Sequence, residues 1–247
     1  MVADMTRWNN DEVDRLKDLY ESVDVSRKEI AKRLQRTESS VTNKAHLLQL
    51  KKIRINLVRP NTSPSVALSY VLGTLLGDGY VYLKQYLIGL GVKAEEFADA
   101  YFHALSKIGL HPNKYVRPDD GRFVVTAKSK LFCEWFLKLS LKDIEKLLLT
   151  NKALIYAFLR GFFDSDGTIN RNAPFIAFYN SNKALLRLVQ RLLKEVGFES
   201  SFHQHHRKNC FGRKPMYVSY LKGGKQAIKD FQDYVEPTIP SKRWWET

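Results

Sequence analysis

The chain has 247 residues, and 44% of them are hydrophobic, which is enough apolar material for one small domain and one larger one. Forty lysines and arginines against 26 aspartates and glutamates give a formal net charge of +14, which indicates a polyanionic partner. Two distant cysteines, Cys133 and Cys210, argue against a disulfide scaffold. No apolar run reaches transmembrane length and no signal peptide begins the chain, so we expect an intracellular, cytoplasmic protein without a membrane partner.

Residues 1–54 predict a small all-α module. Asn9 can cap a first helix, Ser26 begins a capping box for a second, and Thr37 can cap a third. Three short helices with a tight turn before the last are typical of a helix-turn-helix fold. Trp8, Glu12 and the Ser-Val-x-x-Lys run resemble the Myb/SANT-like type.

In such a module the third helix enters a major groove. Residues 27–59 contain ten lysines or arginines against two glutamates, which places the positive charge around that helix. A three-helix bundle that binds another protein remains an alternative. The candidate DNA contacts are Ser39, Ser40, Asn43 and Lys44. Residues 55–62, with Pro60 and Asn61, read as a linker.

A short pattern occurs twice in the remainder of the chain, at Val71–Gly79 and at Leu159–Gly167. Each copy has a glycine, and five residues later an aspartate followed by a second glycine, and the copies are 88 positions apart. The register continues beyond the motifs, because Lys107–Leu110 aligns with Glu195–Phe198 without a gap. The sequence therefore predicts a duplicated unit, with repeat 1 at 63–149 and repeat 2 at 150–247.

Each motif predicts an apolar helix that ends at its acid. Ser63–Pro64 and Thr150 are suitable starts, and Gly79 and Gly167 occupy the usual position after the last turn. Asp78 and Asp166 would then lie at helix C-termini, where the macrodipole disfavours negative charge. A bound divalent cation reverses that preference, and Mg²⁺ is the cation that suits oxygen ligands best here.

Gly73 and Gly161 interrupt these two helices. A glycine inside a helix costs about 1 kcal/mol relative to alanine, so its presence needs a reason. Close approach of two helix backbones is such a reason, and both helices are apolar nearly all round. We therefore expect Gly73 and Gly161 to be helix-packing residues at the centre of the repeat pair.

These residues resemble the LAGLIDADG homing endonucleases. Leu159–Gly167 is close to the family motif, whereas Val71–Gly79 departs from it at Leu76, a position that is not a metal ligand in the family. The resemblance covers roughly residues 63–236 and implies an α+β fold of two pseudo-symmetric αββαββα units in one chain. It also implies packed motif helices at the centre, a saddle of strands on DNA, and metal ligation by Asp78 and Asp166.

Alternating stretches follow the motifs and predict half-buried strands whose polar faces are free for DNA. A basic hairpin in repeat 2 is longer by six residues than its counterpart. The candidate DNA contacts in these strands and this hairpin are Tyr80, Tyr82, Lys84, Arg122, Arg207, Lys208, Arg213 and Lys214. By resemblance, a lysine near the end of the last strand lies beside the metal, and Lys128 and Lys222 occupy the matching positions.

A group of histidines at 203–206 with Cys210 raises the question of zinc. No further pair of ligands stands elsewhere in the sequence, and a structural zinc site needs four ligands. Phosphate-contacting or solvated histidines are therefore the better interpretation.

The sequence favours a monomeric endonuclease that cleaves both strands of double-stranded DNA. The catalytic residues would be Asp78, Asp166, Lys128 and Lys222, with Mg²⁺ as cofactor. Two alternatives stay open on the same fold: a DNA-binding transcriptional regulator without cleavage, and a maturase that binds intron RNA.

Overall fold

The structure is a computed structural model, and it describes residues 8–21, 25–50, 58–170, 172–205 and 215–244. The chain divides into two compact units, residues 1–57 and 58–247. Within the described ranges, no helix has the length and apolar character needed to cross a membrane.

Three helices make up the smaller unit: α1 (Asn10–Glu21), α2 (Arg27–Arg33) and α3 (Glu38–Leu47). The predicted caps are confirmed, because Asn9, Ser26 and Thr37 each accept a hydrogen bond from a backbone N–H in the first turn. The core of the unit includes Leu16, Ile30 and Val41, all fully buried. Arg36 adds a largely buried ion pair with Glu12, at 3.0 Å, and its guanidinium lies over the Trp8 ring.

The larger unit repeats one order of elements. A helix is followed by two strands, a second helix and two more strands, and then by further helices. The elements of its first half are α4 (Val66–Leu76), β1 (Tyr80–Tyr82), η1 (Leu83–Gln85), β2 (Leu87–Val92), α5 (Glu95–Lys107), β3 (Asn113–Val116), β4 (Phe123–Lys128), α6 (Lys130–Lys138) and α7 (Leu141–Leu148). Those of its second half are α8 (Lys152–Asp166), β5 (Gly167–Asn170), β6 (Phe175–Asn180), α9 (Lys183–Glu195), β7 (Ser200–His205), β8 (Met216–Leu221), α10 (Gly224–Val235) and η2 (Pro240–Lys242).

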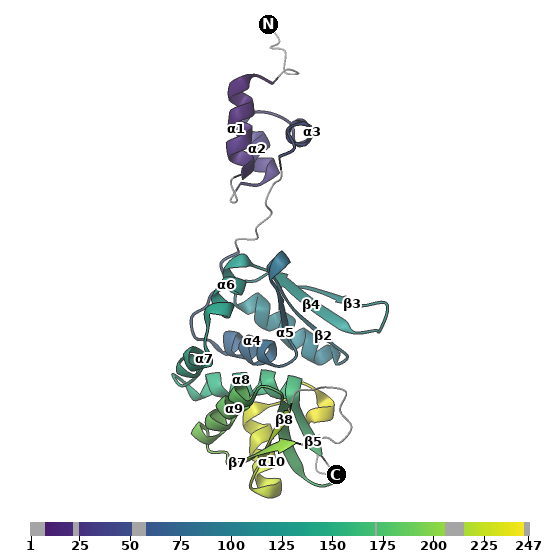
Figure 1. Cartoon of the computed structure of the whole chain (residues 1–247). Coiled ribbons are helices and arrows are strands. Elements are labelled where there is room, and N and C mark those ends of the chain that lie inside the picture. The colour runs from purple at the N-terminus through teal and green to yellow at the C-terminus, as the bar shows by residue number, and fades with distance from the viewer. Residues whose placement is uncertain (1–7, 22–24, 51–57, 171, 206–214, 245–247) are drawn as a thin grey trace. The chain divides into compact units, whose positions relative to one another are not determined.

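Two antiparallel sheets of matching strand order give this unit its mixed α+β fold. The orders are β1-β2-β4-β3 and β5-β6-β8-β7. Figure 1 shows α4 and α8 side by side between the two sheets. One face of each sheet packs on helices, and Phe178 of β6, for example, meets the rings of Phe163 and Phe231.

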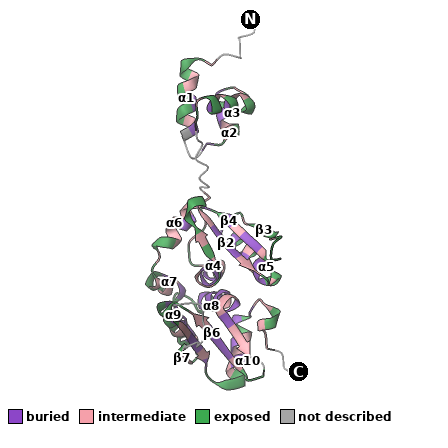
Figure 2. Ribbon diagram, turned by 45° about the vertical axis from the view of Figure 1, so that its right-hand side comes forward, coloured by how far each residue is buried: buried purple, intermediate pink, exposed green. Residues whose placement is uncertain are grey.

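The crossing of α4 and α8 lies at the centre of the core, and Figure 2 shows both helices largely buried. Gly73 sits where a Cβ atom would overlap the carbonyl oxygen of Phe158. A Cβ atom at Gly161 would overlap the carbonyl oxygen of Tyr70 and lie 2.9 Å from Oγ1 of Thr74. The two glycines therefore allow the backbones of the helices to touch, which explains their presence inside helices.

Replacing Gly161 with alanine is expected to lower the free energy of unfolding by about 1–3 kcal/mol, because the added methyl group forces two backbones apart. Urea denaturation followed by circular dichroism measures the change. Gly91→Ala is the matched control, since its Cβ would meet nothing closer than 3.5 Å. An equal loss of stability in both variants would contradict the packing role of Gly161.

The ends of the motif helices differ from the prediction. The N-caps are Ser65 and Asn151, not Ser63 and Thr150, and each accepts a hydrogen bond from a backbone N–H two or three residues later. Neither Gly79 nor Gly167 adopts the left-handed conformation of a helix C-cap. Both are glycines because a Cβ would meet the helix before them: the Cα of Leu75 at 2.6 Å in one case, and the ring of Phe163 in the other.

The strand predicted for Tyr80–Lys84 is shorter in the structure. It ends at Tyr82, and Lys84 lies in the 3₁₀ turn η1, which ends with Tyr86 in a left-handed conformation. An unbroken alternation would place Leu83 on the buried face, but it is 49% exposed. The alternation fails there because the hairpin between β1 and β2 begins two residues earlier than the pattern indicates.

Candidate active site at the ends of the motif helices

The structure brings the ends of the two motif helices together. Asp78 follows the C-cap of α4, and Asp166 is the last residue of α8. A Cβ at Gly77 would overlap Cβ of Ser165 and would lie 3.6 Å from Oδ2 of Asp166. The ends of the two motif helices are therefore neighbours, and the Asp78 carboxylate is close enough to Asp166 to raise its pKa.

Both acids resist ionisation in this position. Burial raises the pKa of Asp78, and the positive charges of Lys242 and Arg122 partly offset this increase. Burial is also the largest cause that raises the pKa of Asp166, to about 6, and repulsion from Asp78 adds to it. A hydrogen bond of 2.6 Å from Nδ2 of Asn180 works in the opposite direction.

A hard divalent cation fits this pair of acids. The donors are carboxylate oxygens, and a positive ion between them would relieve both the burial and the mutual repulsion. Among the residues that the structure describes, no group of three or more His, Cys, Asp or Glu side chains is arranged to hold a metal ion. Two carboxylates occupy only part of the coordination shell of Mg²⁺, and a catalytic metal site uses the other positions for water and substrate.

A lysine that the sequence did not single out stands at the same place. Nζ of Lys242 donates hydrogen bonds to the carbonyl oxygens of Phe163, Asp164 and Ser165, at 2.8, 2.6 and 3.2 Å. These carbonyls belong to the last turn of α8, where a cation is favoured by the helix dipole. Burial lowers the pKa of Lys242, whereas Asp164, Asp78 and Asp166 all raise it. Lys242 therefore places a positive charge close to both motif acids.

A cleft of about 400 Å³ opens beside these groups. Asp78 and Lys242 line it, and so do Lys93 and Arg122 from the first repeat. Three cationic side chains around the acids make the cleft suitable for a phosphate-bearing ligand. Arg122 was predicted as a contact on the strand face, and the structure places it near Asp78 and in an ion pair with Asp120 at 3.1 Å.

The structure does not bring Lys128 or Lys222 to the acids. Lys128 pairs with Leu87, which pairs with Tyr82, so it lies at the opposite end of β1 from Asp78. Lys222 follows β8, which runs antiparallel to β6, and it lies toward the far end of β5 from Asp166. Both side chains are exposed. The assignment failed because it followed position in the sequence, whereas the register carries these strand ends away from the motif acids.

The first sheet carries two of the other predicted contacts on its exposed face. Tyr80 and Tyr82 are 40% and 45% exposed, and the ring of Tyr80 lies over Gly89 of β2. In the second sheet an open groove of about 730 Å³ runs along β5 and β6, lined by Thr168, Asn170 and Tyr179 among others. The exposed faces of both sheets therefore offer aromatic and polar groups to a partner.

Several predicted residues lie elsewhere or outside the described ranges. Ser39 and Asn43 are exposed on α3, and Ser40 and Lys44 are half-buried there. The predicted contacts Arg207, Lys208, Arg213 and Lys214 lie outside the described residues, as does Cys210.

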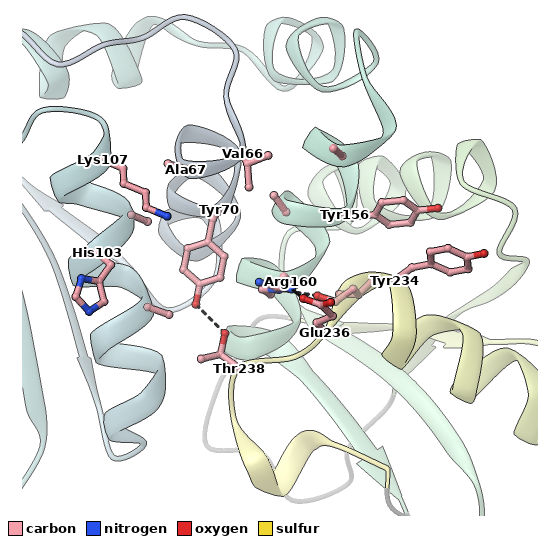
Figure 3. Close-up of a pocket in the computed structure, with 15 residues that line it drawn as sticks. Val66, Ala67, Tyr70, His103, Lys107, Tyr156, Arg160, Tyr234, Glu236 and Thr238 are labelled. Atoms are coloured by element: carbon pink, nitrogen blue, oxygen red, sulfur yellow. Dashed lines mark hydrogen bonds and ion pairs between the residues drawn. The ribbon is translucent and has the colours of Figure 1, made fainter.

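A second cavity, of about 470 Å³, lies at the other end of the motif helices. Val66 and Ala67 of the first turn of α4 line it together with Ala153 and Tyr156 at the start of α8. Figure 3 shows His103, Lys107 and Arg160 around the same space. The motif acids lie at the opposite, C-terminal ends of these helices, so this cavity is separate from the candidate active site.

Comparison with known proteins supports the fold. Residues 153–236 match the sequence profile of the LAGLIDADG-like domain. The chain is 24% identical over 155 residues to the homing endonuclease I-DmoI of Desulfurococcus mucosus, covering 58% of this chain and 77% of that protein. These matches support the resemblance of the chain to the LAGLIDADG family. A solved structure of I-DmoI in complex with DNA and Ca has the same fold, with a TM-score of 0.52 at 20% identity, covering 72% of this chain and 94% of the other.

Two further similar proteins carry less functional information. An uncharacterized protein of Methanocaldococcus jannaschii is 31% identical over 160 residues, which is 60% of this chain. The match spans 61% of the length of that protein. The full-length WhiA protein of Thermatoga maritima shares the fold, with a TM-score of 0.53 at 17% identity, covering 72% of this chain and 57% of WhiA.

Proposed function

We propose that this protein is a site-specific endonuclease that hydrolyses phosphodiester bonds on both strands of a long double-stranded DNA target. The observation that carries the proposal is the pairing of Asp78 and Asp166 at adjoining helix ends, with raised pKa values and with Lys242 beside them. Such a cluster is unfavourable for folding, which is typical of a site kept for chemistry. The similarity of the chain to I-DmoI supports the same proposal.

Each side chain has a distinct part in the proposed reaction. A bound Mg²⁺ would supply an activated water and polarise the scissile phosphate. Asp78 and Asp166, both deprotonated, would hold that ion. Asn180 orients the Asp166 carboxylate through its hydrogen bond. Lys242 would stabilise the negative charge that develops on the phosphate, and Arg122 would help to hold the DNA backbone in the cleft.

We propose the following organisation for DNA binding by a monomer. Residues 63–149 and 150–247 form the two pseudo-symmetric halves of the saddle, and each half places its acid near one strand. Residues 1–54 are a helix-turn-helix module that contacts a major groove through α3, joined by a linker at 55–62. The exposed face of α3 and the outer faces of the sheets support this arrangement.

Incubating the protein with a randomised double-stranded DNA library, with and without Mg²⁺, tests the proposed function. We expect double-strand breaks at one recurring sequence in the presence of Mg²⁺ and intact DNA when EDTA is added. Sequencing the broken ends identifies the target. Specific binding of DNA without breaks would favour a transcriptional regulator, and preferential binding of structured RNA would favour a maturase.

A further inference from the structure

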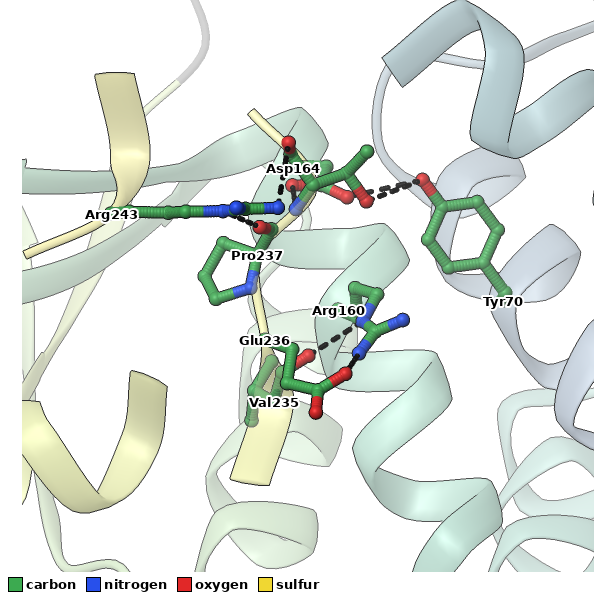
Figure 4. A network of polar contacts seen from close by, with 8 residues as sticks. Tyr70, Arg160, Asp164, Val235, Glu236, Pro237 and Arg243 are labelled. Carbon is green, nitrogen blue, oxygen red and sulfur yellow. Dashed lines mark hydrogen bonds and ion pairs between the residues drawn. The ribbon is translucent and has the colours of Figure 1, made fainter. Parts of the chain in front are cut away.

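The segment that carries Lys242 is held on α8 by two side chains of that helix. Arg160 Nε donates to the carbonyl oxygen of Val235 at 2.6 Å, and its guanidinium forms an ion pair with Glu236. Asp164, one turn further along α8, accepts hydrogen bonds from the backbone N–H groups of Thr238 and Ile239, at 2.9 and 3.4 Å. Figure 4 shows Arg160 and Asp164 facing the segment from the same side of the helix. We call residues 235–244 the strap.

Asp164 points inward and is only 2% exposed. Its second oxygen accepts a hydrogen bond of 3.1 Å from Oη of Tyr70 on α4, so its carboxylate joins α4, α8 and the strap. A buried carboxylate in an apolar helix is unfavourable unless it is fully hydrogen-bonded, and here each oxygen has a partner. Asp164 is the sixth residue of the motif Leu159–Gly167. Its hydrogen bond to Ile239 therefore fixes the backbone three residues before Lys242.

The first repeat provides an internal comparison. The positions 88 residues before Arg160 and Asp164 are Leu72 and Leu76, and neither can bind a backbone group. In that repeat α6 is followed by the helix α7, which leads directly to α8. The two polar residues thus occur in the repeat whose end carries the strap, which ties them to the strap rather than to the packing of the motif helices.

The position of Nζ depends on the strap. Lysine has a flexible four-carbon side chain, so three hydrogen bonds to the last turn of α8 hold only if the backbone of Lys242 is fixed. Gln232 contributes from α10, since its side chain binds both the carbonyl oxygen of Lys242 and the N–H of Trp244. The strap is therefore anchored on both sides of Lys242.

We propose that Arg160 and Asp164 are positioning residues that hold Lys242 at the motif acids and so control the rate of the chemical step. The proposal rests on the proposed function, because Lys242 must take part in cleavage for its position to matter. It assigns to Asp164 a role in catalysis that is exerted through the strap.

Single-turnover cleavage of the selected target tests the proposal with Asp164→Leu, which installs the residue of the first repeat. We expect the rate at saturating protein to fall about ten- to a hundredfold, with the Kd for DNA unchanged within about twofold. Asp164→Asn keeps an acceptor for Thr238 and Ile239 and should retain most of the rate. Arg160→Leu releases the strap from a second side-chain contact with α8 and should also slow cleavage.

A double-mutant cycle with Lys242→Met separates positioning from a general structural role. If Asp164 acts through Lys242, then the double variant Asp164→Leu, Lys242→Met cleaves no more slowly than Lys242→Met alone. Multiplicative losses in the double variant would overturn the proposal.

Hydrogen exchange measured by mass spectrometry on the strap gives a readout that needs no cleavage. The amides of Thr238 and Ile239 should exchange faster in Asp164→Leu than in the wild type, whereas those of α5 should be unchanged. Faster exchange with an undiminished cleavage rate would overturn the proposal. Failure of the wild type to cleave any DNA in Mg²⁺ would overturn the proposed function instead, and the exchange data would still test the strap.

Discussion

Replacing both motif acids with asparagine, in Asp78→Asn and Asp166→Asn, is expected to abolish Mg²⁺-dependent cleavage while DNA binding persists. Asparagine keeps the size of the side chain and can still accept the hydrogen bond from Asn180. It supplies no negative charge for a divalent cation, so we expect rate losses of at least about 10³-fold in the double variant. Gel analysis of the selected target, run beside fluorescence anisotropy for binding, measures both quantities.

The same substitution at Asp166 should make the metal-free protein more stable. The pKa of Asp166 is raised from 3.8 to about 6, so its protonated form is favoured in the folded chain. The folded state therefore loses stability as pH rises from 3.8 through about 6, and the full penalty is present at neutral pH. Asp166→Asn removes this penalty and should add about 1–3 kcal/mol to the free energy of unfolding at pH 7.5. Urea denaturation in EDTA measures the change.

Two controls separate this result from a general effect of the substitution. At pH 3.5 the wild type and Asp166→Asn should have nearly equal stability, because the carboxyl group is then largely protonated in both states. Asp233→Asn on α10 changes the same functional group away from the site. Loss of cleavage together with loss of stability at neutral pH would indicate damage to the fold and contradict the assignment of Asp166 as a ligand.

Signals that repeat in the sequence predicted the central helix pair of the larger unit. The motif spacing of 88 residues located α4 and α8, and Gly73 and Gly161 lie where a Cβ would collide with the facing backbone. These features could be recognised because each occurs twice in register, and one copy supports the interpretation of the other. The strand β4 followed from the alternation of apolar and polar side chains, and β8 followed from the similarity of residues 217–222 to residues 123–128.

Lys242 could not be recognised in this way. It occurs once, in a short irregular segment after α10, and nothing in the surrounding residues marks it as buried. Its position depends on long-range contacts, with Nζ bound to the carbonyl oxygen of Phe163, 79 residues earlier. Asn180 was missed for a related reason, since its contact with Asp166 depends on the register of β5 and β6. One sequence signal was present: Arg160 and Asp164 are charged residues within a largely apolar motif helix, and the structure shows both bound to the strap.

The second large effect is expected at Lys242. Lys242→Met should lower the rate of cleavage by about 10²- to 10³-fold, the range observed when one preorganised group that stabilises transition-state charge is removed. Methionine fills a similar volume without the ammonium group. Binding of DNA should change little, because this is one of 40 cationic side chains in the chain. Single-turnover rates at saturating protein measure the chemical step directly.

Lys128→Met and Lys222→Met are the matched controls for this prediction. Both remove a lysine from the same unit of the protein, and both positions are exposed and lie away from the motif acids. Their cleavage rates should stay within about threefold of the wild type, since an exposed charge at this distance is screened by solvent. If Lys222→Met proves slower than Lys242→Met, the lysine at the strand end is the catalytic one. The contacts of Lys242 with the last turn of α8 would then serve only to cap that helix.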